Sequence, residues 1–363
     1  MSSPLCNAPF SRIFSTATSY RNCCATNPQI VSSPLDSVVE WWNSSELDNF
    51  RKKLYGDQLP EDCASCSIAE NARGNSFRTA LNKIPYASNR PNSWNLVFGN
   101  ICNIACWTCS ERYSSTIAQQ KQQISVLPTN FQDPNEIFLR RWPDMHDSII
   151  KSYDHHDIIT LTVLGGEPTY NKTVIDFLSE LVENGLSQQT RLEMTTNGTK
   201  LNNRLSKILE KNNWNHTSVF VSIDAIGNKA EWLRYGSRWA DVEKSINFYQ
   251  QNGHYIELHT VASILNIHDL PDVHDYAESK NIKHTINSLS NPAYFSLQNW
   301  DGARDFLNRS DFESRNLIKY YNSLSESPVI GTKQAVASYI QQFTNRKKLA
   351  DFDATLAKIL DLL

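Results

Sequence analysis

From Trp94 onward, short apolar runs alternate with stretches whose apolar residues recur at helical spacing. The runs are rich in β-branched and aromatic residues and predict strands over residues 94–98, 158–164, 191–196, 218–223, 255–262 and, more weakly, 282–289. Between them, residues 172–184, 239–252 and 269–280 each place their apolar side chains on one face of a helix. Residues 114–157 are too many for one crossover and predict an insertion.

Strands that alternate with helices in this way predict parallel pairing with right-handed crossovers. Six such units are fewer than a closed eight-fold barrel needs. We therefore predict an α/β fold, with a partial (β/α)6 TIM-like barrel over residues 91–290. Helical patterns without a chemical motif follow Pro292, and they predict a helical C-terminal extension over residues 291–363.

Residues 1–90 follow a different pattern and predict a small cysteine-rich module of their own. Two short helices are expected, one over residues 37–42 and one over residues 45–55. The second would be capped by its first residue, a serine, and stopped by Gly56. A turn that carries Cys63 and Cys66 closes the segment, and a polar, proline-containing joint separates it from the barrel.

Composition narrows the class of protein. Of 363 residues, 40% are hydrophobic and 20% charged, which allows a sizeable core and excludes general disorder. The net charge of −3 argues against a protein held to nucleic acid by charge. No apolar run approaches the roughly 18 residues of a membrane span, and the first residues do not resemble a secretory signal. We therefore expect a soluble, cytoplasmic protein without a membrane partner.

All eight cysteines lie in the first third of the chain, where they are more typical of metal ligands or redox thiols than of disulfides. Cys102, Cys106 and Cys109 directly follow the first predicted barrel strand, with the spacing Cys-x3-Cys-x2-Cys. Three thiolates in one loop suit zinc or an iron–sulfur cluster. A structural zinc site is closed by four protein ligands, whereas a [4Fe–4S] cluster held by three cysteines leaves one iron free.

This spacing, with Trp107 directly after the second cysteine, resembles the signature of the radical S-adenosylmethionine superfamily. The resemblance implies that the three cysteines bind a core [4Fe–4S] cluster whose free iron binds S-adenosylmethionine. One electron from the cluster then cleaves the sulfonium and gives a 5′-deoxyadenosyl radical, which abstracts a hydrogen from the substrate. An electron donor such as a flavodoxin or ferredoxin is implied as a partner.

The resemblance extends to the ends of three further predicted strands. Gly-Gly-Glu-Pro at residues 165–168 looks like the family motif that holds the methionyl ammonium group. In the peptide-modifying branch, a Ser-x-Asp strand end and a later arginine engage the carboxylate of S-adenosylmethionine, and an arginine suits a carboxylate. The cofactor contacts implied by the resemblance are Trp107, Gly165, Gly166, Glu167, Asn197, Ser222 and Arg234.

The front module is similar to the SPASM/twitch modules that bind auxiliary iron–sulfur clusters. Such a module usually follows the barrel, but here it precedes it. The resemblance implies a second [4Fe–4S] cluster bound by Cys6, Cys63, Cys66 and either Cys23 or Cys24. We favour Cys23, because adjacent side chains on an extended chain diverge. Zinc closed by four cysteines is the alternative.

The resemblance as a whole implies a radical S-adenosylmethionine enzyme, an oxidoreductase that acts on a peptide or protein side chain. The same chemistry on a small molecule or nucleoside is a first alternative. A non-catalytic, zinc-binding interaction protein is an alternative from a different class. No catalytic residue beyond the cluster ligands can be assigned from the sequence, and the bond that is formed is not indicated.

Overall fold

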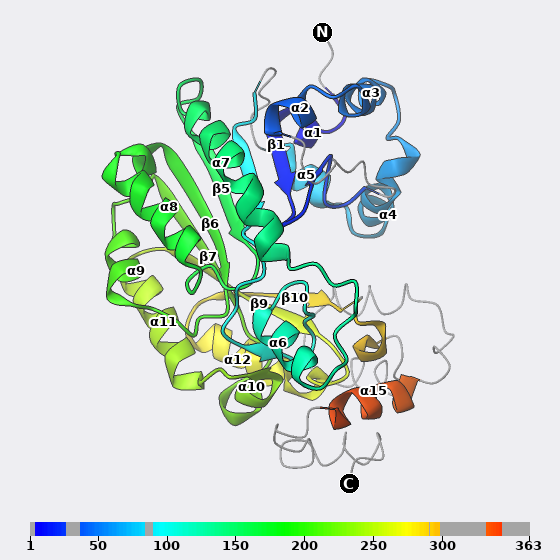
Figure 1. Ribbon diagram of the computed structural model, residues 1–363, viewed down its shortest axis with the longest axis vertical. Coiled ribbons are helices and arrows are strands. Elements are labelled where there is room, and N and C mark those ends of the chain that lie inside the picture. Colours follow the sequence, from blue (N-terminus) through cyan, green and yellow to red (C-terminus); the bar gives the residue numbers. More distant parts are fainter. Residues whose placement is uncertain (1–3, 27–36, 84–89, 290, 298–331, 343–363) are drawn as a thin grey trace. The chain divides into compact units, whose positions relative to one another are not determined.

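The computed structural model of the chain describes residues 4–26, 37–83, 90–289, 291–297 and 332–342 (Figure 1). The chain forms two compact units. The first unit consists of Met1–Ile101, Asn130–Met194 and Ile208–Thr217, and the second consists of Cys102–Thr129, Thr195–Lys207 and Ser218–Leu363. None of the described helices is long and apolar enough to cross a membrane.

In the described part of the first unit, strands pair in the order β2-β1-β3-β5-β6. Their bounds are Arg12–Ser15 for β1, Tyr20–Arg21 for β2, Ser93–Val97 for β3, Ile159–Leu164 for β5 and Thr190–Thr196 for β6. Only β1 and β2 pair antiparallel, and the other pairs are parallel. The expected α/β class with parallel pairing is therefore confirmed, and the alternation is consistent with a partial barrel.

The short strand β1 joins the front segment to the first barrel strand. Its four residues are all buried, and Arg12 to Ser15 pair in parallel register with Ser93 to Leu96 of β3. This strand is not visible in the sequence pattern, because four residues are too few to show a strand period. The front segment and β3 belong to the same compact unit. The expected domain boundary at residue 90 therefore stays a prediction.

The helices of the first unit are short in the front segment and longer after β3. They are α1 (Ala8–Ser11), α2 (Val38–Trp42), α3 (Ser45–Lys53), α4 (Ala64–Arg73), α5 (Phe77–Leu81), α7 (Pro134–Ser152) and α8 (Lys172–Glu183), with 3-10 turns at Glu61–Cys63 and Leu186–Gln189. The insertion expected between the first two barrel strands contains α7, which packs on α8 through Trp142 and Phe177 with ring centroids 5.1 Å apart.

Two local predictions in the front segment were wrong. Helix α3 is capped by Ser44, whose extended backbone lets its hydroxyl accept the N–H of Leu47, and Ser45 is already helical. The chain at Cys63 and Cys66 is not an isolated turn. Cys63 ends a 3-10 turn, and Cys66 lies in the first turn of α4, because the residues after Pro60 continue as a helix up to Gly74.

The second unit has its own set of parallel strands. Strand β9 lies between β7 and β10, and a separate antiparallel pair is formed by β4 and β8. The bounds are Ala105–Cys106 for β4, His216–Ser222 for β7, Arg234–Tyr235 for β8, Tyr255–Ala262 for β9 and Lys283–Ser288 for β10.

The described helices of the second unit follow these strands or pack against the apolar core. They are α6 (Ser115–Gln123), α9 (Asn203–Ile208), α10 (Gly227–Leu233), α11 (Trp239–Gln251), α12 (Leu270–Ser279) and α15 (Thr332–Gln341), with 3-10 turns at Ile267–Asp269 and Ala293–Phe295. Helix α15 and the 3-10 turn at Ala293–Phe295 are the described elements of the expected C-terminal extension. Most of the remainder of that extension lies outside the described residues.

Candidate metal and cofactor sites

The loop that carries Cys102, Cys106 and Cys109 is held by hydroxyl groups at the start of α6. Ser114 donates to the carbonyl of Ile104 at 2.8 Å, and Thr116 donates to the carbonyl of Cys102 at 2.7 Å. The N–H of Cys102 donates to the hydroxyl of Ser115. These hydroxyl residues are not among the predicted site residues, although a run of Ser-Ser-Thr five residues after the cysteine motif is a visible signal.

The three thiols of this loop interact electrostatically. Burial, and then the neighbouring Cys106 and Cys102, raise the pKa of the Cys109 thiol to about 12. Among the described residues no three His, Cys, Asp or Glu side chains gather closely enough to hold a single metal ion, so the three thiols interact without meeting at one point. A bound cation relieves the repulsion of their thiolates. This donor set fits a thiophilic metal centre, and an iron–sulfur cluster in particular.

Arg234 places a buried positive charge beside the cysteine loop. It lies on β8, in register with Cys106 on β4. Its Nη1 donates to Asp224 Oδ2 at 3.1 Å, and Asp224 Oδ1 accepts the N–H of Val261. Burial lowers the pKa of Arg234, but Cys106 and Asp224 raise it by more, so the net pKa shift is upward. Arg234 Nε is buried without a partner among the described residues, which fits an anionic ligand group.

Asn197 is predicted to contact the cofactor, and the structure shows what its amide does within the protein. Its Oδ1 accepts the N–H and the hydroxyl of Thr199, and its Nδ2 donates to Asn103 Oδ1 at 3.1 Å. Asn103 in turn donates to the Thr199 hydroxyl at 2.8 Å. Because Asn103 lies between Cys102 and Cys106, this network ties the cysteine loop to Asn197 and Thr199 of the same unit.

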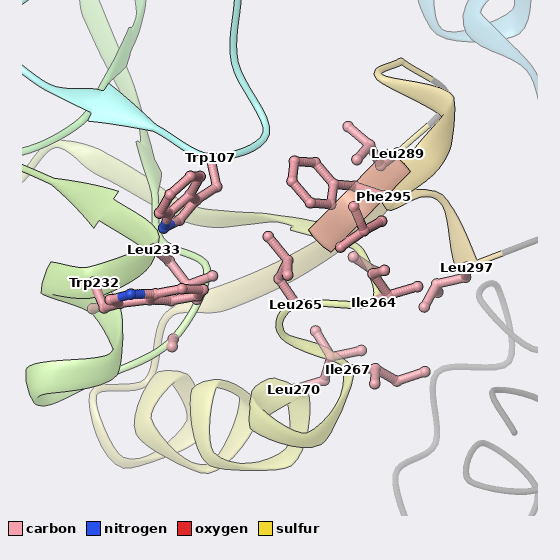
Figure 2. Packing of buried hydrophobic residues seen from close by; sticks show 14 residues of the cluster. Trp107, Trp232, Leu233, Ile264, Leu265, Ile267, Leu270, Leu289, Phe295 and Leu297 are labelled. Atoms are coloured by element: carbon pink, nitrogen blue, oxygen red, sulfur yellow. The ribbon is translucent and has the colours of Figure 1, made fainter. Parts of the chain in front are cut away.

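The other two predicted contacts of the second unit lie in different surroundings. Ser222 is partly buried at the end of β7, paired in register with His259. Trp107 is fully buried and packs against Trp232 in an apolar cluster, with ring centroids 5.3 Å apart (Figure 2). Its backbone N–H donates to the carbonyl of Leu233. The indole of Trp107 therefore anchors the cysteine loop in the core of its unit.

The Gly-Gly-Glu motif of the first unit packs against the chain just before the cysteine loop. Gly165 and Gly166 have φ values of +91° and +53°, and a Cβ on Gly166 would lie 2.1 Å from the carbonyl oxygen of Ile101. The N–H of Glu167 donates to that same carbonyl at 2.7 Å. The Glu167 carboxylate is buried and accepts both the N–H and the hydroxyl of Thr169. The glycines thus permit a close contact with the protein's own backbone.

We expect Gly166→Ala to destabilise the protein by about 3 kcal/mol or more, because the new Cβ collides with backbone and the φ is left-handed. Gly185→Ala is the matched control. Gly185 also has a left-handed φ, but a Cβ there meets nothing within 4 Å, so only a strain of about 1 kcal/mol is expected. Chemical denaturation of both variants measures the difference. Equal stability of the two variants would contradict the packing role of Gly166.

Four cysteines of the front segment surround one small cavity. Cys6, Cys23, Cys63 and Cys66 line a space of about 20 Å³ together with apolar side chains and Arg78, whereas Cys24 is exposed and does not line it. Among the residues that the structure describes, no three His, Cys, Asp or Glu side chains gather closely enough to hold a single metal ion. The thiols therefore surround a space and do not meet at one point.

The electrostatic surroundings of these thiols are mixed. Burial raises the pKa of Cys6 to about 11, and burial raises that of Cys63 to about 12, with the other cavity thiols contributing in both cases. A hydrogen bond with Cys24 lowers the pKa of Cys23. Two arginines act on the group: Arg78 lowers the pKa of Cys6, and Arg12 interacts with Cys23. A buried set of thiols near cations fits a site for thiolate ligands.

Comparison with known proteins gives a family and a set of distant structures. A family model described as "Radical SAM superfamily" matches residues 96–277. No curated protein matches the chain in sequence. Among solved structures, the chain is similar to native anSMEcpe with bound AdoMet and Cp18Cys peptide, with 17% identity, a TM-score of 0.38 and coverage of 56% of this chain and 54% of that chain.

Two other structures are similarly distant. SuiB of Streptococcus suis bound to S-adenosylmethionine has 16% identity and a TM-score of 0.39, with 72% of this chain and 55% of that chain covered. The radical S-adenosylmethionine methyltransferase TsrM from Kitasatospora setae has 12% identity and a TM-score of 0.37, with 54% of this chain and 34% of that chain covered. The chain thus spans about half the length of anSMEcpe and of SuiB, and about a third of the length of TsrM.

Proposed function

Because the chain belongs to the radical S-adenosylmethionine superfamily of enzymes, we propose that it cleaves S-adenosylmethionine reductively and abstracts a hydrogen from a peptide or protein side chain. Membership implies a [4Fe–4S] cluster and S-adenosylmethionine as cofactors. When bound, the cluster supplies the electron for the cleavage. The observation that supports this proposal best is a loop of three interacting thiols beside a buried arginine with an unpaired donor.

The residues of the chain have separate roles in this proposal. Cys102, Cys106 and Cys109 would hold the cluster. Arg234 would bind the carboxylate of S-adenosylmethionine, and Asp224 would position its guanidinium through the bond at 3.1 Å. Glu167, with its carboxylate already oriented by Thr169, would accept the methionyl ammonium. Each role uses a charge of the sign opposite to the ligand group it meets.

The choice of a peptide or protein as substrate rests on the Ser222-x-Asp224 strand end. This strand end and a following arginine resemble the peptide-modifying branch, and the structure adds that Asp224 binds that arginine directly. The arrangement supports the proposal because the Asp224 end of the motif binds the guanidinium group that would meet the carboxylate of S-adenosylmethionine.

Anaerobic preparation tests the proposal as a whole. The protein, reconstituted with iron and sulfide and reduced with dithionite, should convert S-adenosylmethionine to 5′-deoxyadenosine, as measured by mass spectrometry. Elemental analysis should find iron and sulfide. Zinc alone, with no 5′-deoxyadenosine, would identify the protein as a zinc-binding module and exclude the proposed activity.

We expect Arg234→Ala to weaken the binding of S-adenosylmethionine about ten- to a hundred-fold, the scale of one charge-assisted hydrogen bond. Arg238→Ala is the matched control, because that arginine lies a few residues away, is 73% exposed and pairs with Asp241 at the surface. Isothermal titration of both anaerobic variants measures the affinities, and circular dichroism checks their folding. Wild-type affinity in a folded Arg234→Ala protein would place the carboxylate elsewhere.

We further propose that the front cavity binds a second [4Fe–4S] cluster through Cys6, Cys23, Cys63 and Cys66. A cavity of about 20 Å³ excludes an organic ligand, so the support for a metal centre comes from the four thiols that line it. A single zinc ion with bonds of about 2.3 Å would bring its four sulfurs within about 3.8 Å of one another. Thiols placed around a space favour the cluster, because each thiolate then binds a different iron.

A further inference from the structure

A cavity of ligand size lies in the first unit, between α2, the start of β3 and the last turns of α7. Its volume is about 330 Å³, within the lower range of small-molecule sites. Trp94 lines it from the N-terminal end of β3, whereas the Gly-Gly-Glu motif follows the C-terminal end of the parallel strand β5. Since barrel enzymes react at the C-terminal ends of their strands, this cavity is not the reaction site.

Trp94, which lines the cavity, carries a buried hydrogen-bond donor. Trp94 is 1% exposed, and its indole Nε1 has no hydrogen-bond partner among the described residues. A buried donor without a partner is unfavourable, and an acceptor atom of a ligand relieves that cost. Trp42 and Val39 of α2 provide an apolar wall, and Val39 is 60% exposed although it is a large hydrophobic residue. A ligand with an acceptor oxygen would bind the Trp94 N–H, and an apolar group on the same ligand would pack against the wall formed by α2.

The charges around the cavity balance. Asp144, Asp147 and Lys151 line it from α7, and Arg90 lines it from the segment before β3. Asp144 is already engaged, since its Oδ2 accepts the N–H of Val38 at 2.8 Å and so joins α2 to α7. Two cations and two carboxylates give no net charge, so the cavity favours a dipolar ligand over a simple anion or cation.

We propose that this cavity binds a free apolar α-amino acid through both of its charged groups. The carboxylate would accept the Trp94 N–H and pair with Lys151, and the ammonium group would pair with Asp147. The apolar side chain would lie against Trp42. This site is separate from the cluster and does not depend on the proposed radical chemistry.

Isothermal titration of the full chain with three probes tests the proposal and separates the sources. Binding of L-phenylalanine that is stronger than that of both blocked probes indicates a free amino acid. Equal binding of N-acetyl-L-phenylalanine or of L-phenylalaninamide shows that one charged group suffices, as in a peptide terminus, and overturns the free amino acid as the ligand. No heat of binding for any of the three probes at millimolar concentration overturns the proposal.

Two variants locate the binding on this cavity. Trp94→Phe removes the donor, and Lys151→Met removes an exposed charge without touching the core. Each variant should bind the tightest-binding probe about tenfold more weakly or worse, the scale of a hydrogen bond to a charged group. Lys172→Met is the matched control, since that lysine is 85% exposed on α8 of the same unit and does not line the cavity. Unchanged affinity in Lys151→Met and Trp94→Phe places the bound probe elsewhere and refutes the site.

Discussion

Replacement of Cys102, Cys106 and Cys109 with alanine is expected to abolish the formation of 5′-deoxyadenosine. Without the three thiolates, no protein ligand remains in this loop to hold the core cluster, and the electron for cleavage is lost. The rest of the loop should keep its fold, because Ser114 and Thr116 bind its backbone and not its thiols. Mass spectrometry of the reduced, anaerobic variant with S-adenosylmethionine measures the product.

The same variant separates the two proposed metal centres. Its iron content should fall by the share of the core cluster, and the front cavity should keep its metal, because none of its four thiols is changed. Undiminished 5′-deoxyadenosine in the triple variant would refute the assignment of the core site. Loss of all iron would show that the front cavity does not bind iron by itself.

Replacement of Cys6, Cys63 and Cys66 with serine is expected to remove the second cluster and to destabilise the front segment. Cys6 and Cys63 are part of the apolar core around the cavity, and a small core depends strongly on a metal centre. Iron and sulfide analysis measures the metal, and thermal unfolding measures the stability.

The adjacent pair Cys23 and Cys24 provides an internal control for the same centre. Cys23 is buried and lines the cavity, whereas Cys24 is exposed. Cys23→Ser should therefore lower the iron content as the other cavity variants do, and Cys24→Ser should leave it unchanged. The opposite result would assign the ligand role to Cys24. Zinc in place of iron in the wild-type cavity would contradict the proposed cluster.

The strands of the barrel were predictable because each one carries its own signal. The six predicted segments lie within two residues of β3, β5, β6, β7, β9 and β10, and the bounds of β9 agree at both ends. Long buried strands need continuous apolar residues, and this requirement is visible without knowledge of the neighbours. The same holds for α8 and α11, whose apolar faces and terminal glycines are local features.

The short elements were missed or misplaced because their conformation depends on distant partners. Strand β1 exists through its pairing with β3, about eighty residues away, and four residues give no period of their own. The choice between Ser44 and Ser45 as cap depends on which of two adjacent serines has an extended backbone. Neither the pairing of β1 nor the choice of Ser44 as the cap can be read from residue type.

The sequence by itself determined the superfamily, the α/β class and the loop of three cysteines, since spacing along the chain specifies which thiols share one loop. Only the tertiary structure decided which side chains position the others. It showed that Asp224 binds Arg234, that Asn103 of the cysteine loop binds Asn197, and that Cys23 rather than Cys24 faces the front cavity. These contacts join residues far apart in the chain, and they follow from packing and burial, which a local pattern does not contain.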